Sequence, residues 1–192
     1  MKKKIIKLAH PRVAYSVEML KETLLFLLTT RRYSDITVMD LCRQAEISRG
    51  TFYKHFRHIG ELVDLLLDDV LNRIGNVPLQ SLCKPVNRSC DGQPLCGFLR
   101  KHRKYIPLFL SDSLSSHSIR RTVDHLLPGF LSVMKDRTKM DEDLLGDLLY
   151  YQITGCIAVF GRHLDVSDEE WDRRKCNVDT FLVNGLGFLQ ED

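Results

Sequence analysis

The feature that most constrains the fold is the stretch TVMDLCRQAEISRGTFYKHF, residues 37–56. Apolar residues recur at helical spacing before and after Glu46, so one short helix must end and another begin within about three residues. Thr37 and Asp40 resemble a capping box at the start of the first helix, and Ser48 suits the N-cap of the second. Two short helices joined this tightly and packed on a longer one predict a helix-turn-helix.

The second helix of this pair has a core side and a polar side. Phe52 and Phe56 lie four positions apart and share a face, which predicts Phe52 as the core anchor. The major groove of DNA admits one helix, and residues at the start of that helix reach the base edges. Residue spacing alone does not exclude a helix-turn-helix that has only a structural role. The residues placed to contact DNA are Ser48, Arg49, Gly50 and Thr51 at base edges and Tyr53, Lys54 and His55 at phosphates.

Helical periodicity continues along the chain, and the sequence contains neither a convincing strand alternation nor an internal repeat. We therefore predict an all-α protein. Residues 76–94 hold three prolines and few periodic apolar positions, so they are expected to form a loop. The predicted helices cover residues 11–32, 37–45, 48–56, 59–74, 95–109, 118–135, 141–164 and 167–189.

Charge and hydropathy narrow the class of protein. Residues 1–60 carry twelve lysines and arginines against five acidic residues, which suggests a basic end that meets a polyanion. A solvated lysine tail at residues 2–4 accounts for part of this excess. No apolar run approaches the roughly 20 residues of a membrane helix, and the N-terminus is too charged for a signal peptide. We therefore expect a cytoplasmic protein with no membrane partner.

The six cysteines do not form a C-x-x-C pair. In a cytosolic protein we expect reduced thiols that are buried as small hydrophobic residues. Cys83, Cys90 and Cys96 lie in or beside the expected loop, and their spacing matches no standard zinc pattern. We expect no metal and no cofactor, while a thiol sensor that uses these three residues is an alternative.

The last two predicted helices are unusually apolar. Residues 144–160 are apolar nearly all round, and the final helix carries apolar residues on more than one face. Such helices must be covered on every side, and a second copy related by twofold symmetry is the expected cover. A central place in the core of one protomer is the alternative. The predicted interface residues are Leu148, Gln152, Cys156, Phe160, Val178, Phe181 and Leu182.

Residues 37–56 resemble the DNA-binding signature of the TetR/AcrR family of transcriptional regulators. The resemblance covers about residues 8–65, and the remainder is similar to the family only in length, helical character and apolar final helices. The matching pieces are Thr37-Val38, Asp40-Leu41, Ala45, Ile47 through Tyr53, His55-Phe56 and Glu61-Leu62.

The resemblance implies a tetracycline-repressor-like fold with two domains. Residues 1–58 would form the helix-turn-helix DNA-binding domain, and residues 59–192 a helical ligand-binding and dimerisation domain. By the resemblance, Thr37, Tyr53 and His55 would contact phosphates, and Arg49 and Thr51 would contact base edges. Lys54 is added to the phosphate contacts because of its charge and its position on the helix.

The chain departs from the family pattern at two places. Glu46 stands where the family usually has Gly, and a positive φ there costs a non-Gly residue about 1 kcal/mol. A carboxylate this near DNA is also mildly repulsive. Arg57 and His58 stand where the family usually has a Lys before its acidic pair, and they are candidate substitutes for its phosphate contact.

The effector site is the part that the sequence determines least. Helical spacing does not separate a pocket residue from an ordinary core residue. The resemblance implies a small-molecule effector, whose identity the sequence does not give. The candidate pocket residues are Phe98, His102, Tyr105, Phe130, Met134 and Tyr151.

These patterns lead to one functional hypothesis, a homodimeric regulator that represses from a near-palindromic operator on double-stranded DNA and is released by an effector. Its two recognition helices would enter successive major grooves about 34–36 Å apart. Activation, or thiol sensing, through the same DNA-binding domain is the alternative. An enzyme is disfavoured because the sequence contains no triad arrangement, no paired catalytic carboxylates and no nucleotide-binding glycine loop.

Overall fold

The computed structural model describes residues 11–74, 94–135 and 138–185, and every regular element within these ranges is helical. The prediction of an all-α fold is therefore confirmed. The chain forms two compact units. In the described ranges, the N-terminal unit contains residues 11–70 and 104–115, and the C-terminal unit contains residues 71–74, 94–103, 116–135 and 138–185.

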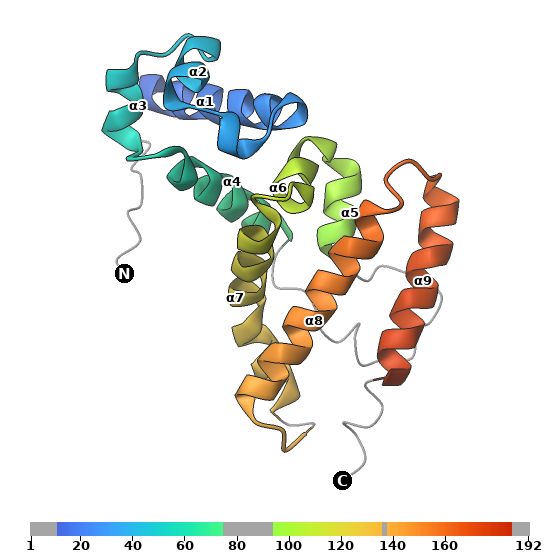
Figure 1. Ribbon diagram of the computed structural model, residues 1–192. Helices are drawn as coiled ribbons and strands as arrows, with labels where there is room; N and C mark the ends of the chain where they lie inside the picture. The colour runs from blue at the N-terminus through green and yellow to red at the C-terminus, as the bar shows by residue number, and fades with distance from the viewer. Residues whose placement is uncertain (1–10, 75–93, 136–137, 186–192) are drawn as a thin grey trace. The chain divides into compact units, whose positions relative to one another are not determined.

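The N-terminal unit is built from the helices α1 to α4, which run from blue to green in Figure 1, and one short helix from further along the chain. The helix α1 packs against α2 and α6, and α2 packs against α3. Leu20, Leu41 and Phe52 have no exposed surface, so the core lies where these helices meet. The elements are α1 (Pro11–Thr30), a 3₁₀ turn (Tyr33–Asp35), α2 (Val38–Gln44), α3 (Arg49–His55), α4 (Ile59–Ile74) up to residue 70, and α6 (Ile106–Leu110).

Ion pairs connect α1 to α4 and to the segment that precedes α6 within this unit. The Nζ atom of Lys21 lies 2.5 Å from the Asp69 carboxylate on α4 and 2.7 Å from Glu18. Burial alone would lower the pKa of Lys21, but its hydrogen bonds to Asp69 and Glu18 outweigh burial and raise that pKa. The adjacent Glu22 accepts a hydrogen bond of 2.6 Å from Lys104, just before α6. Consecutive residues of α1 therefore hold two different segments.

The helix predicted over residues 95–109 is divided in the structure. One helix, α5 (Pro94–Lys101), ends early, a 3₁₀ turn covers Arg103–Tyr105, and α6 then begins at Ile106. Pro107 lies in the first turn of α6, where a missing amide is tolerated, whereas it would break a continuous helix. The prediction of a single helix was wrong for this reason. Most of the loop expected at residues 76–94 lies outside the described residues.

The C-terminal unit is held together by side chains from three helices. They are α5, α8 (Glu142–Gly161) and α9 (Asp168–Gly185), and the unit also contains most of α7 (Ser115–Met134). Phe160 of α8 has no exposed surface and meets Trp171 of α9 edge to face, with ring centroids 5.4 Å apart. The guanidinium of Arg100 on α5 lies 5.5 Å from the Trp171 ring and pairs with Asp168 at 2.5 Å. These contacts join α5, α8 and α9.

The helix α8 has a buried side and an apolar exposed side. Leu144 is 42% exposed and Tyr151 is 71% exposed, so the expectation of burial all round fails within one protomer. By length and composition, α8 is the one helix among the described residues that could cross a membrane, which the sequence analysis did not anticipate. A core helix of a soluble protein meets the same criterion, and one side of α8 is buried in the unit. Its buried residues are Leu145, Leu149, Gln152, Ile153, Cys156, Ile157 and Phe160.

Candidate nucleic-acid interface

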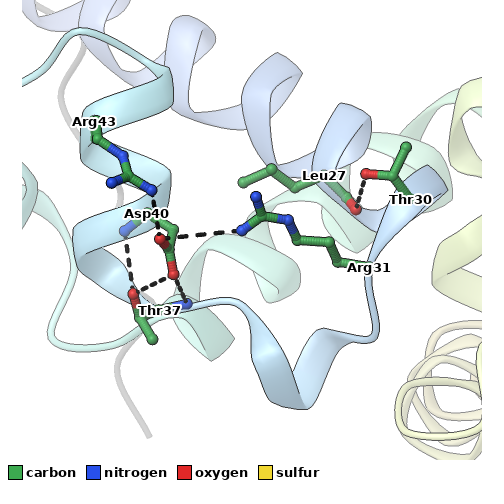
Figure 2. Close-up of polar contacts among 6 residues, drawn as sticks. All are labelled: Leu27, Thr30, Arg31, Thr37, Asp40 and Arg43. Atoms are coloured by element: carbon green, nitrogen blue, oxygen red, sulfur yellow. Dashed lines mark hydrogen bonds and ion pairs between the residues drawn. The ribbon is translucent and has the colours of Figure 1, made fainter.

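The predicted capping box at the start of α2 is present. The hydroxyl of Thr37 accepts a hydrogen bond from the backbone N–H of Asp40 at 3.1 Å. In return, the Asp40 carboxylate accepts from the backbone N–H of Thr37 at 3.3 Å and from its hydroxyl at 2.6 Å, as Figure 2 shows. These hydrogen bonds hold the pKa of Asp40 below its usual range. Asp40 therefore completes the capping box in place of the usual Glu or Gln.

The turn between α2 and α3 is a Schellman motif. The backbone N–H of Ile47 donates to the carbonyl of Cys42 at 2.9 Å, and that of Glu46 donates to the carbonyl of Arg43 at 3.3 Å. This pattern requires a left-handed residue after the helix, and Glu46 has a φ of 55°. Among the described residues it is the one non-glycine residue with positive φ. The strain anticipated at Glu46 is therefore present.

Glu46→Gly should raise the free energy of unfolding of the N-terminal unit by about 1 kcal/mol, because glycine adopts the left-handed conformation without the steric cost. Glu46→Gln is the matched control, since it removes the same charge but keeps the strained backbone. Chemical denaturation followed by circular dichroism measures both. A Gly variant that is no more stable than the Gln variant would contradict the strain at this position.

The start of α3 is fixed by Ser48, as predicted. Its Oγ accepts a hydrogen bond of 3.1 Å from the backbone N–H of Thr51 and lies 2.9 Å from the Thr51 hydroxyl. The Thr51 side chain is thus oriented toward Ser48. A base contact through the Thr51 hydroxyl would have to share or replace this bond. The side chain of Arg49, the first residue of α3, is exposed.

The rest of α3 separates core from surface as the pattern predicted. Phe52 has no exposed surface and packs on Phe56 with ring centroids 5.6 Å apart. Tyr53 meets the Phe52 ring edge on at 5.4 Å but keeps 57% of its surface exposed, so it is not a core residue. Lys54 is exposed and His55 is half-buried. The polar residues of α3 are therefore available to a partner.

Gly50 is exposed near the beginning of α3. A Cβ atom built there would meet only the Ser48 hydroxyl, at 3.8 Å, which is ordinary van der Waals contact. Packing within the protein therefore does not require glycine at this position. This absence of an internal reason is consistent with the close approach of an external partner.

One local arrangement was missed by the sequence interpretation. The Glu61 carboxylate in the first turn of α4 accepts hydrogen bonds from the backbone N–H of Arg57 at 2.7 Å and from its Nε at 2.6 Å. The backbone and side-chain bonds to Arg57 lower the pKa of Glu61. Arg57, a candidate substitute phosphate contact, is thus already paired. The four-residue spacing of Arg57 and Glu61 was the available signal.

No protein-family model matches the chain, and no curated protein matches it. Among solved structures, the chain is similar to the dihydroxyacetone kinase operon activator DhaS, at a TM-score of 0.53 and 15% identity over 92% of this chain and 98% of that one. The TetR family repressor AlkX from Dietzia sp. strain DQ12-45-1b aligns at a TM-score of 0.49 and 16% identity over 90% and 98%. The chain shares the fold of DhaS. DhaS is named as an activator of an operon and not as an enzyme.

The predicted effector residues come from both units. Tyr105 belongs to the N-terminal unit and the other five to the C-terminal unit. Tyr105, Phe130 and Met134 are buried, Phe98 is half-buried, and His102 is exposed with its ring 4.4 Å from that of Phe98. Tyr151 is 71% exposed on α8, so it belongs to an outer surface instead of a pocket wall.

The predicted interface residues also divide. Gln152, Cys156 and Phe160 are buried within the protomer, because they share the side of α8 that packs inside the unit. The prediction that these three residues lie at a dimer interface on the protomer surface is therefore wrong. Leu148 and Val178 are half-buried and Phe181 is 71% exposed, while the side chain of Leu182 lies outside the described set.

Three of the four cysteines that the structure describes are buried, and the fourth, Cys176, is half-buried. Cys42, Cys96 and Cys156 are buried, and burial raises the pKa of the Cys42 thiol. Cys83 and Cys90 lie outside the described residues. Where side chains are described, no group of three or more His, Cys, Asp or Glu residues could hold a metal ion.

Proposed function

We propose that the chain is a DNA-binding transcriptional regulator that acts in the cytoplasm as a homodimer on a near-palindromic operator. The observation that carries the proposal is the exposed start of α3, where Arg49 and Gly50 face away from a core anchored by Phe52. A capped short helix presented in this way is the element that a helix-turn-helix protein inserts into the major groove. Residues 1–58 would then act as the DNA-binding domain and residues 59–192 as the effector and dimerisation domain.

The proposed dimer contact is an outer stripe of α8, formed by Leu144, Leu148, Tyr151, Gly155 and Ala158. Steps of four and three residues place them on one helical face, opposite the buried one. A Cβ atom at Gly155 would meet nothing within 4 Å, so there is room for a close neighbour. Exposed apolar stripes mark association sites, and the copy that offers the same stripe is the simplest occupant. The stripe replaces the buried residues of the original interface prediction.

The first test is selection of bound fragments from genomic DNA by the full-length protein. The selected fragments should share a near-palindromic site whose half-sites are centred about 34–36 Å apart. A reporter that carries such a site gives the sign of regulation. Deletion of the regulator should increase expression, because we propose repression. DhaS is named as an activator, so the fold does not decide this sign.

Arg49→Ala and Lys54→Ala should weaken DNA binding in different ways. Loss of a base contact by Arg49 should remove about 1–3 kcal/mol of preference for a selected duplex over a scrambled one. Loss of a phosphate contact by Lys54 should weaken both duplexes equally and flatten the salt dependence. Fluorescence anisotropy titrations at several salt concentrations measure both effects. Wild-type protein that binds the scrambled duplex as tightly as the selected one would contradict specific recognition.

Release of DNA by a small molecule is the least constrained part of the proposal. An effector that prefers a different spacing of the two recognition helices would move the dimer away from the bound state. Complete switching requires that its affinities for the two states differ by about 10⁴-fold. The genes beside a selected operator would indicate the chemical class to screen. A thiol sensor has less support, because Cys96 is buried.

A further inference from the structure

Asp40 does more than cap α2, because its two carboxylate oxygens have separate partners. Oδ2 accepts from the backbone N–H and the hydroxyl of Thr37. Oδ1 accepts from Nη2 of Arg43 at 3.0 Å and lies 4.0 Å from Nη1 of Arg31. Figure 2 shows the guanidinium groups approaching this carboxylate from two sides, Arg31 from the end of α1 and Arg43 from α2. One residue therefore organises a cap and a pair of cations.

The two arginines have capacity left for another anion. The Arg43 side chain is 72% exposed and that of Arg31 is 47% exposed, whereas that of Asp40 is only 18% exposed. A guanidinium has five N–H donors in a planar fork that matches a phosphate. Asp40 accepts a hydrogen bond from one nitrogen of Arg43 and lies at ion-pair distance from one nitrogen of Arg31. Asp40 and Arg43 lie on the side of α2 opposite the buried Leu41 and Cys42. The cations are therefore held at the surface.

We propose that Arg31 and Arg43 bind phosphate groups of the DNA backbone and that Asp40 is the positioning residue that holds them. This inference rests on the proposed function and names further contacts at the same interface. In a helix-turn-helix, the first helix crosses the sugar-phosphate backbone while the second enters the groove, which places the outer side of α2 near phosphates. Neither arginine belongs to the family-derived set of DNA contacts.

Removal of the Asp40 charge is expected to weaken DNA binding, whereas simple electrostatics predicts that it strengthens binding. Removal of a carboxylate near a polyanion should strengthen binding if Asp40 acts only through its charge. A positioning role requires weaker binding, because both guanidinium groups lose their anchor. The cap does not explain a charge at this position, since neutral Gln also completes a capping box. The charge and the cap can therefore be separated by substitution.

Asp40→Glu and Asp40→Gln form the matched pair, because both residues are usual in a capping box and only Glu keeps the charge. The two variants are titrated with a duplex selected by the wild-type protein and with a scrambled duplex of equal length. We expect the Gln variant to bind both duplexes several-fold more weakly than the Glu variant, at equal thermal stability. Equal or tighter binding by the Gln variant would overturn the positioning role.

Arg43→Ala tests the phosphate contact itself. It should reduce the slope of log affinity against log salt by about 0.9, which corresponds to about eightfold weaker binding at 0.1 M salt. Arg173→Ala is the control, because Arg173 is also 72% exposed and pairs at the same i,i+3 spacing, with Glu170, but lies on α9. A slope equal to that of the wild type in Arg43→Ala would overturn the contact.

Failure of the proposed function would look different from failure of this inference. If the wild-type protein binds the selected and the scrambled duplex equally tightly, specific regulation is overturned. A phosphate contact does not depend on the base sequence, so it can still be measured on the scrambled duplex. Normal specific binding, together with an unchanged salt slope in Arg43→Ala, overturns only the roles of Arg31, Arg43 and Asp40.

Discussion

Phe52→Ala should lower the free energy of unfolding of the N-terminal unit by about 3–5 kcal/mol, because it removes a buried aromatic ring and leaves a cavity. Phe52 has no exposed surface and packs directly on Phe56. A loss of this size is a large part of the roughly 5–15 kcal/mol that stabilises a typical domain. Urea denaturation followed by circular dichroism measures the change, and DNA binding should fail with the fold.

Tyr53→Ala is the control for this prediction. It removes a similar ring from the adjacent position, but Tyr53 is 57% exposed, so little buried surface is lost. Its denaturation midpoint should stay near that of the wild type while its affinity for every duplex falls, because Tyr53 is proposed to contact a phosphate. If both variants unfold at the wild-type urea concentration, Phe52 is not the anchor of α3.

Tyr151→Asp should dissociate the proposed dimer. Tyr151 lies at the centre of the α8 outer stripe and is 71% exposed in the protomer, so it is a natural anchor residue for an interface. Truncation of such an anchor costs about 2 kcal/mol or more. A twofold axis applies the change twice, so the dimer dissociation constant should rise about a thousandfold. Sedimentation equilibrium measures the dissociation constant.

Operator length distinguishes dimer loss from damage to the DNA-binding helices. The Tyr151→Asp protein should bind a full palindrome only about as tightly as a half-site, because two linked contacts no longer reinforce each other. Tyr15→Asp on α1 changes a tyrosine that is 67% exposed outside the stripe, and it should leave the mass unchanged. A wild-type protein that is monomeric at all concentrations would contradict the dimer.

Local features of the N-terminal unit could be predicted because each depends on residues close in sequence. The Thr37 cap, the Ser48 cap and the strained backbone at Glu46 are all present in the structure. Caps and turns need only a few residues with the right side chains, so the pattern and its physical cause lie together. The all-α prediction is confirmed, and the chain shares the fold of DhaS at 15% identity.

Features that depend on tertiary contacts could not be predicted as well. A helix that is apolar nearly all round does not reveal which side packs inside its own protomer, so the stripe containing Gln152 and Phe160 was assigned to the interface although it is buried. The break before α6 was missed because Pro107 is compatible with either a kink or a new helix start. The ion pair between Asp40 and Arg31 was missed because Arg31 lies nine residues earlier in the chain, directly after α1.

The turn at Glu46 has a consequence for how this protein can change over generations. The codons for glutamate and glycine differ at one nucleotide, so the unstrained turn is accessible by a single base substitution. Under the proposed function, that substitution would also remove a carboxylate from the neighbourhood of the DNA backbone, which favours tighter binding. Stability and affinity would then increase together at a position whose φ is 55°. Under the proposed function, in which α3 sets the sequence preference, Glu46 is therefore a site where selection can adjust occupancy of an operator and leave that preference unchanged.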